Sequence, residues 1–238
     1  YKPQRWFESR GGFPKDMKPR VWCAGDMPEG LEALGEKGEG GPLFPITTAR
    51  VGAGVCMAMR RDVLMEVGPF DPALGAGTST RGGEDLDMFA RILATGDVII
   101  HTPDALVHHR HRVDEAGLDK QIRGNGSGMA ALLTKAIIEK PSVLCTLVGR
   151  IPGILKRIKP GGARVAGRDD DTPGSLTRSE IKGFLEGPFL YLSSRKRNRL
   201  APLHPADEPA ADATAQNSAD AAPASSEERG TPEGNTSA

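Results

Sequence analysis

Hydrophobic periodicity predicts alternating strands and helices between residues 51 and 140. The apolar run at 54–59 predicts a short buried strand, and the spacing over 61–67 predicts a helix that a Gly-Pro pair ends. A second helix is predicted from Glu84 to Gly96, because apolar residues recur there at i, i+3, i+4 and i+7: Leu86, Phe89, Ala90 and Leu93. Together with a strand predicted at 97–101, this alternation favours an α/β layered domain.

Three further elements complete the pattern of this region. Residues 75–83 are predicted to form a glycine-rich loop, and residues 105–109 are a candidate for another strand. A long helical pattern runs from Asp114 to Lys140. The glycines at 124–128 predict an interruption in that helix, because glycine is a poor helix former.

The flanking regions have a different composition and suggest separate parts. Residues 1–50 combine glycine, proline and charge with scattered aromatic residues, and the stretch 35–41 predicts an exposed loop. Residues 141–200 are apolar and basic in alternation, with helical spacing over 143–158 that Pro152-Gly153 is expected to break into two short helices. Residues 201–238 have almost no large apolar side chain, which predicts a disordered tail. The chain therefore divides at about residues 140 and 200.

Composition and charge narrow the class of function. The 31 basic residues balance the 31 acidic residues, so no nucleic-acid partner is expected. Three widely spaced cysteines form no CxxC pair, so neither a disulfide framework nor a structural zinc site is predicted, and a reducing compartment is expected. No apolar run of about 18 residues occurs. The chain begins at Tyr1 without a basic-then-apolar leader, and we expect an upstream part to be absent.

The segment Arg81 to Asp87 is the first candidate site. Glu84 and Asp85 occupy the first turn of a predicted helix directly after a glycine-rich loop. The helix N-terminus favours their ionised forms, and an ionised carboxylate at a loop edge can accept a proton from a substrate hydroxyl. First-turn acids also stabilise helices without any further role, so a structural reading stays open. The glycines match neither the dinucleotide fingerprint nor the P-loop.

The segment His108-His109-Arg110-His111-Arg112 is the second candidate. In an extended segment, His109 and His111 project from one face. Neutral imidazoles can bind a divalent metal, and arginines can offset phosphate charge. Two histidines do not complete a metal site, so a solvated basic strand end is an equal alternative.

Two stretches in the C-terminal half carry weaker signals. The basic amphipathic stretch 143–158 can lie on an anionic membrane surface or dock against the core of the protein. The basic run 195–199 indicates a solvated helix end or a contact with lipid headgroups. The acidic run 169–171 lies in a polar linker and predicts a solvated turn.

Several motifs in a fixed order resemble family 2 glycosyltransferases. They are Gly52-Ala53-Gly54 with Met57 to Arg61, Val67 to Asp71, Gly75 to Thr78, Gly82 to Asp87, and Thr102-Pro103 continuing to Arg112. The resemblance covers roughly residues 1–140. Glu180 to Gly183 and Gly187 to Leu192 are similar to the C-terminal extensions of some bacterial members.

The resemblance implies part of an A-type glycosyltransferase (nucleotide-diphospho-sugar transferase) fold, with a helical C-terminal extension and a disordered tail. Residues 1–140 would be the acceptor-side part, residues 141–200 an amphipathic basic extension and residues 201–238 the tail. The family moves a sugar, with inversion, from a nucleotide-diphosphate donor to an acceptor hydroxyl. A glycan or lipid-linked acceptor in bacterial envelope or surface glycan synthesis is therefore expected.

The resemblance also implies roles for single residues. The residue that resembles Asp85 is the family's general base, and the one that resembles Glu84 supports the site or contacts the acceptor; inversion by a single displacement needs only one base. Mg²⁺ or Mn²⁺ neutralises the departing diphosphate in the intact enzyme, and His109 best matches a metal-binding histidine of some relatives. The candidate substrate-binding residues are Arg81, Gly82, Gly83, Arg110 and Arg112.

The family's nucleotide-binding half and its Asp-x-Asp metal motif have no counterpart here, so this chain is expected not to turn over alone. Asp85-Leu86-Asp87 has the letters of that motif but stands at the base position. A cytoplasmic location is expected, with peripheral contact at the inner face of the cell membrane left open. The alternatives are a non-catalytic membrane-surface or partner-binding module, and a metal hydrolase built on His109, His111, Glu84 and Asp85.

Overall fold

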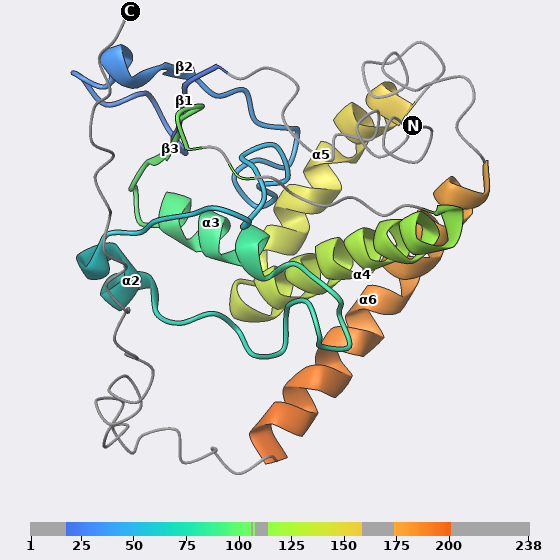
Figure 1. Ribbon diagram of the computed structural model, residues 1–238. Helices are drawn as coiled ribbons and strands as arrows, with labels where there is room; N and C mark the ends of the chain where they lie inside the picture. Colours follow the sequence, from blue (N-terminus) through green and yellow to red (C-terminus); the bar gives the residue numbers. More distant parts are fainter. Residues whose placement is uncertain (1–17, 106, 108–113, 159–173, 201–238) are drawn as a thin grey trace, which may run out of the picture. The chain divides into compact units, whose positions relative to one another are not determined.

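The computed structural model describes residues 18–105, 107, 114–158 and 174–200 (Figure 1). Its elements are the strands β1 (Arg20–Trp22), β2 (Glu36–Lys37) and β3 (Ile99–His101), the 3-10 helix η1 (Glu32–Leu34), and the helices α2 (Arg61–Val67), α3 (Glu84–Ala94), α4 (Glu115–Glu139), α5 (Ser142–Ile158) and α6 (Gly174–Leu200). The mixed α/β class predicted from the periodicity is confirmed. The predicted tail at 201–238 and the acidic run at 169–171 lie outside the described residues.

The three strands form one small sheet in the order β2-β1-β3. β1 is parallel to β2 and antiparallel to β3, with Val21 opposite Lys37 on one side and Ile100 on the other. The strand predicted at 97–101 is confirmed as β3. The exposed loop predicted at 35–41 is partly wrong, because its residues 36–37 pair with β1 and its Gly38 packs beneath the Trp22 ring.

The buried strand predicted at 54–59 is absent, and the prediction is wrong. Residues 54–56 form turns, and Val55 and Met57 are exposed. The Gly54 amide donates to the Asp85 carboxylate on α3, so this segment is held by a side chain rather than by a neighbouring strand. An apolar run predicts burial, and here tertiary contacts direct two of its large side chains to solvent.

One apolar cluster joins the sheet to α3. Trp22, Val51, Phe89 and Leu93 are buried together, and Phe44 and Ile99 pack against them. Phe89 and Leu93 belong to the apolar stripe that predicted this helix, and α3 ends at Ala94, just before the predicted stop at Gly96. The cluster therefore fixes where the first turn of α3 lies.

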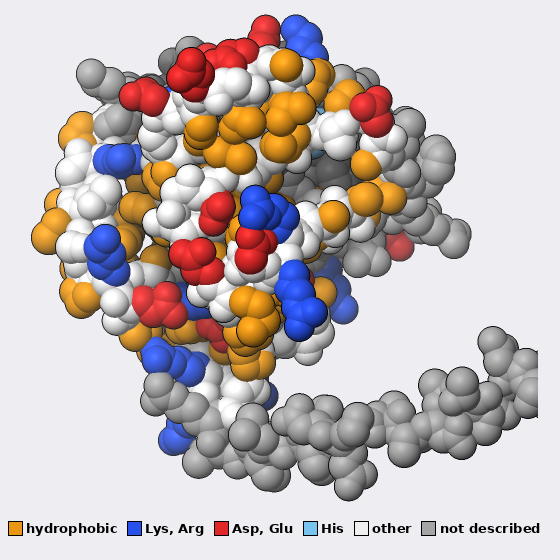
Figure 2. Space-filling model, turned by 90° about the vertical axis from the view of Figure 1, so that its left-hand side faces the viewer, with side chains coloured by type: hydrophobic (Ala, Val, Ile, Leu, Met, Phe, Trp, Pro, Cys, Tyr) orange, Lys and Arg blue, Asp and Glu red, His pale blue; other side chains and the backbone are white. Residues whose placement is uncertain are grey.

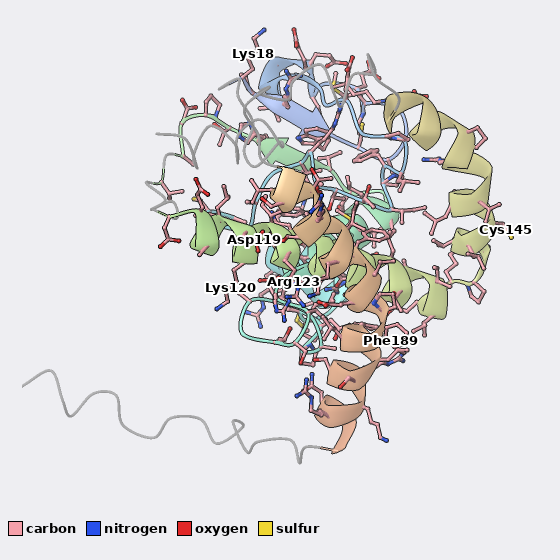
Figure 3. The ribbon with its side chains drawn as sticks, turned by 90° about the vertical axis from the view of Figure 1, so that its right-hand side faces the viewer. Lys18, Asp119, Lys120, Arg123, Cys145 and Phe189 are labelled. Carbon is pink, nitrogen blue, oxygen red and sulfur yellow. The ribbon has the colours of Figure 1, made fainter. Side chains whose placement is uncertain are left out.

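Helices α4 and α6 cross at short distance (Figures 1 and 3). The interruption predicted at 124–128 is wrong, since α4 is continuous from Glu115 to Glu139. An added Cβ at Gly183 of α6 would collide with the Arg123 carbonyl oxygen, and one at Gly187 would lie 2.5 Å from the Ala130 Cβ. Close backbone packing thus offsets the low helix propensity of the glycines.

Helix α5 also runs unbroken, with Pro152 in its interior. The break expected at Pro152-Gly153 is therefore wrong. Proline removes one backbone hydrogen bond, to the carbonyl four residues earlier. That carbonyl belongs to Val148, an exposed residue, so water can satisfy it. Within the described part of the chain, neither α5 nor any other helix combines the length and apolar character needed to cross a bilayer.

Candidate functional site

The first turn of α3 carries three carboxylates, Glu84, Asp85 and Asp87. Gly83 caps the helix with φ +99°, in the left-handed region that favours glycine. A Cβ at Gly83 would also lie 2.7 Å from the Gly128 carbonyl oxygen of α4. The start of the helix therefore packs against α4 by backbone contact. The three acidic side chains contact different partners.

Asp85 is held by backbone amides. Its Oδ2 accepts a hydrogen bond of 2.9 Å from the Gly54 amide, and its Oδ1 accepts one of 2.8 Å from the Leu86 amide. The residue is only half-buried. In the ion pairs that involve this turn, as far as the chain is described, the carboxylate is that of Asp87 and not that of Asp85. Asp85 is thus a fixed carboxylate with solvent access, as a general base requires.

Gly54 packs so closely against Asp85 that a larger residue there would displace the Asp85 side chain. A Cβ at Gly54 would lie 2.8 Å from the Asp85 Cβ and 2.5 Å from the Met57 Cε. The methionine end is flexible, but the Asp85 Cβ is attached directly to the helix backbone. The glycine that begins the mispredicted strand therefore serves as a close contact of the candidate base.

Glu84 ties the glycine-rich loop to α3. Its Oε1 accepts a hydrogen bond of 3.1 Å from the Ala76 amide. Gly75 and Gly82 form an isolated antiparallel bridge that closes the loop, and the Gly75 amide donates to the Gly82 carbonyl at 3.3 Å. The loop predicted at 75–83 is therefore present, and Glu84 connects it to the first turn of α3.

Asp87 turns into the protein interior. Its Oδ2 accepts from the Lys135 Nζ at 2.8 Å and from the Arg91 Nε at 3.0 Å. The side chains of Lys135 and Asp87 are 6% and 5% exposed, so this is a buried ion pair. Arg91 also donates to the carbonyls of Val67, Gly68 and Pro69 and thereby fixes the end of α2.

The network extends through Lys135 to a second carboxylate. The Lys135 Nζ lies 3.2 Å from the Asp71 Oδ2, which also accepts the Tyr191 hydroxyl of α6 at 3.0 Å. Burial opposes ionisation of Asp71, but the Ala73 amide, the Lys135 charge and the Tyr191 hydroxyl together lower its pKa. Burial and the adjacent Asp71 carboxylate raise the pKa of Tyr191.

Sequence reasoning missed this network. Asp87 and Arg91 stand four residues apart on one helix, which is a recognisable ion-pair spacing. Lys135 in an otherwise apolar stretch of α4 was the second available signal, because a lysine on a core-facing position needs a carboxylate partner. The partner itself is 48 residues away and no local pattern identifies it.

Arg81 lies between the loop and α6. Its φ of +64° is in the left-handed region, which costs a non-glycine residue about 1 kcal/mol or more. Its guanidinium is 4.0 Å from the Glu186 carboxylate of α6, which also forms a two-bond pair with Arg123. The hydrogen bond from Arg123 lowers the pKa of Glu186. Arg81 is therefore drawn toward α6 and α4, on the same loop as Gly82 and Gly83.

The second candidate site cannot be placed. His109, Arg110, His111 and Arg112 lie outside the described residues, as does most of the strand predicted at 105–109. Among the residues that are described, no three His, Cys, Asp or Glu side chains gather closely enough to hold a metal ion. The described residues alone therefore do not fit a bound Mg²⁺ or Mn²⁺, and no step is derived through one.

On the face shown in Figure 2, acidic and basic side chains are interspersed over the middle, and several acidic side chains lie along the upper edge. Comparison with known proteins identifies no relative: no family model, no curated protein and no solved structure matches the chain.

Proposed function

We propose that this chain is the acceptor-side part of an inverting glycosyltransferase of family 2, with the A-type fold, in which Asp85 is the general base. Its substrates are a nucleotide-diphosphate sugar and the hydroxyl of a glycan or lipid-linked acceptor in envelope or surface glycan synthesis. The enzyme works in the cytoplasm. The ordered motifs quoted above support the family, and the different environments of Asp85 and Asp87 support the assignment of the base.

The single observation that carries the proposal is the state of the Asp85 carboxylate. Amides of Gly54 and Leu86 fix it at a half-buried position, and the neighbouring cations, buried Lys135 and half-buried Arg91, pair with Asp87 instead. Asp87 is held in a buried ion pair and its side chain is only 5% exposed, so an acceptor hydroxyl cannot reach it. Among the described residues, Asp85 is not held in such an ion pair, and the two backbone amides still fix its position.

The proposed chemistry is a single displacement with Asp85 as the base. The acceptor hydroxyl is a weak nucleophile, so its proton passes to Asp85 as its oxygen attacks the anomeric carbon. The bond from that carbon to the diphosphate oxygen breaks on the opposite side, and the configuration inverts. Glu84 holds the 75–83 loop, whose residues Arg81, Gly82 and Gly83 would line the acceptor.

The test is Asp85→Asn in a longer natural form that also carries a nucleotide-binding half, because the chain alone is expected not to turn over. The amide keeps the side-chain size but cannot take the proton, so we expect transfer from nucleotide-diphosphate sugars to fall by at least about 100-fold. Donor binding, measured by titration calorimetry, should change less than about threefold, because the donor does not need the base. Transfer within a factor of two of the parent protein would remove Asp85 from this role.

A further inference from the structure

Helix α6 has two faces of opposite character. Its inner face packs against α4 and the 71–74 segment through buried residues such as Leu176, Gly183, Gly187, Tyr191 and Ser194. The opposite face is apolar yet exposed: Ile181, Leu185, Phe189 and Leu192 all have at least half of their surface in solvent, with Phe189 at 76% and Leu185 at 68%. Phe189 is labelled on α6 in Figure 3. No described element covers these side chains.

The apolar residues belong to a longer stripe with basic ends. Arg178, Lys182, Leu185, Phe189, Leu192 and Lys196 follow one another at intervals of three or four residues, which places them in one line along the helix. Arg178, Lys182 and Lys196 are all exposed. The stripe has no acidic member: Glu186 pairs with Arg123 of α4, and Glu180 comes two residues after Arg178, which places it on the opposite side of the helix.

The charge pattern of the stripe indicates what kind of surface could cover it: a second copy of the chain, a partner peptide or a membrane. Two copies of the stripe, paired parallel or antiparallel, would bring basic ends together, so self-association is disfavoured. The stripe is also the ridge of a single helix and not a groove that would hold a partner peptide. An anionic bilayer surface accepts a ridge without any matching pocket, because lipid chains rearrange around inserted side chains.

The dimensions fit a helix that lies flat on a membrane. The apolar part of the stripe, from Leu185 to Leu192, spans roughly 10 Å along the axis. With basic residues beyond both ends, each end can contact anionic headgroups while the apolar middle enters the acyl boundary. A helix that inserted end-on would instead bury one basic end.

We infer that the outward stripe of α6, from Arg178 to Lys196, binds the surface of anionic membranes. This surface is distinct from the stretch at 143–158 that the sequence suggested for such contact, and it does not depend on the proposed transferase reaction. It places the chain at a lipid surface with α6 in the plane of the interface.

The experiment measures co-sedimentation of the full chain with vesicles made of equal parts phosphatidylglycerol and phosphatidylcholine, and with vesicles of phosphatidylcholine alone. The chain should bind the anionic vesicles at least about tenfold more tightly, and binding should weaken severalfold in about 0.5 M NaCl, because salt screens the basic residues. Absence of binding to the anionic vesicles would overturn the inference.

Two double variants locate the surface. Leu185→Ser with Phe189→Ser should reduce binding at least about tenfold by removing inserted apolar area. Lys182→Glu with Lys196→Glu should lower binding to anionic vesicles by a similar factor and remove its salt dependence. The matched control is Met65→Ser on α2, an equally exposed apolar residue outside the stripe, which should stay within about twofold.

Contrary outcomes are distinguishable. Unchanged binding in the Leu185/Phe189 variant would overturn the inference, as would a wild-type chain that self-associates in light scattering and loses that association, but not vesicle binding, in the same variant. Asp85→Asn should bind vesicles like the wild type. Failure of the transferase proposal and failure of this one therefore give different results.

Discussion

At the scale of single residues, two aspartates on one helix turn have acquired opposite environments. Asp85 receives backbone amides at a half-buried position, whereas Asp87 is buried against Lys135 and Arg91. The sequence predicted that first-turn acids would either stabilise the helix or act on a substrate, and it could not distinguish between them. The choice depends on Lys135, which reaches this turn only after the chain has folded.

Lys135 is the residue whose loss should damage the fold most directly. Lys135→Met leaves the buried Asp87 and the half-buried Asp71 without their shared cation, and we expect the free energy of unfolding to fall by about 3–5 kcal/mol. Denaturant titration followed by circular dichroism measures the change. Lys120→Met, at an exposed position on the same helix, should change stability by less than about 0.5 kcal/mol. Equal effects of the two substitutions would show that the network does not stabilise the chain.

At the scale of elements, the packing of α4 against α6 explains why the local sequence pattern gave a wrong prediction in this region. The spacing of apolar residues correctly predicted α2, α3 and the extent of α4, because each of these helices presents a periodic stripe. The glycines of α4 predicted a break because local propensity does not include their distant partners: Gly124 and Gly128 pack against the loop at Arg81 and Gly82, and Gly126 packs against Glu180 of α6. Strand β1 was not predicted, since three residues are too few to establish a period.

The helix crossing can be tested by adding one methyl group. Gly183→Ala places a Cβ against the Arg123 carbonyl, so the helices must separate. We expect a loss of about 2–3 kcal/mol in unfolding free energy, measured by denaturant titration. Gly149→Ala is the matched control, because it lies inside α5 with nothing within 4 Å of the added atom. There the better helix propensity of alanine should leave stability unchanged or raise it by up to about 1 kcal/mol. A neutral Gly183→Ala would contradict the close packing.

At the scale of the whole molecule, the buried network links the 68–71 segment, α3, α4 and α6, and it couples stability to pH. The lowered pKa of Asp71 means that its contribution is present above its ordinary value of about 4 and is lost on acidification. The raised pKa of Tyr191 means that the neutral phenol is favoured in the folded chain. That contribution is complete below about pH 10 and is lost as the pH rises further.

The substitution Tyr191→Phe separates the contribution of Tyr191 to the pH dependence of stability from that of Asp71. Loss of the hydroxyl that donates to Asp71 should lower the free energy of unfolding at neutral pH by about 1.5 kcal/mol. The same substitution should reduce the decline in stability between about pH 10 and pH 11, because the phenol no longer titrates. Thermal unfolding followed across this range measures both. An unchanged alkaline slope would mean that Tyr191 ionises as easily in the folded chain as in the unfolded one.

The sequence predicted the elements around the candidate site better than the site itself. Glu84 and Asp85 were located correctly on the first turn of a helix after a glycine loop. The contact that positions Asp85 was missed, because Gly54 was assigned to a strand. Local patterns report which residues face a core, but they do not report which distant amide a carboxylate will accept.

The central claim is that Asp85 acts as the base whereas Asp87 stabilises the fold. One paired measurement tests this claim most directly. Asp85→Asn and Asp87→Asn are compared for the melting temperature of the chain. In a longer form that also carries a nucleotide-binding half, and below both melting temperatures, they are compared for the rate of sugar transfer per folded molecule. The account predicts that Asp85→Asn melts close to the parent protein but loses transfer, whereas Asp87→Asn melts several degrees lower and retains most of its transfer per folded molecule. Normal transfer by Asp85→Asn, or loss of transfer without loss of stability in Asp87→Asn, would contradict it.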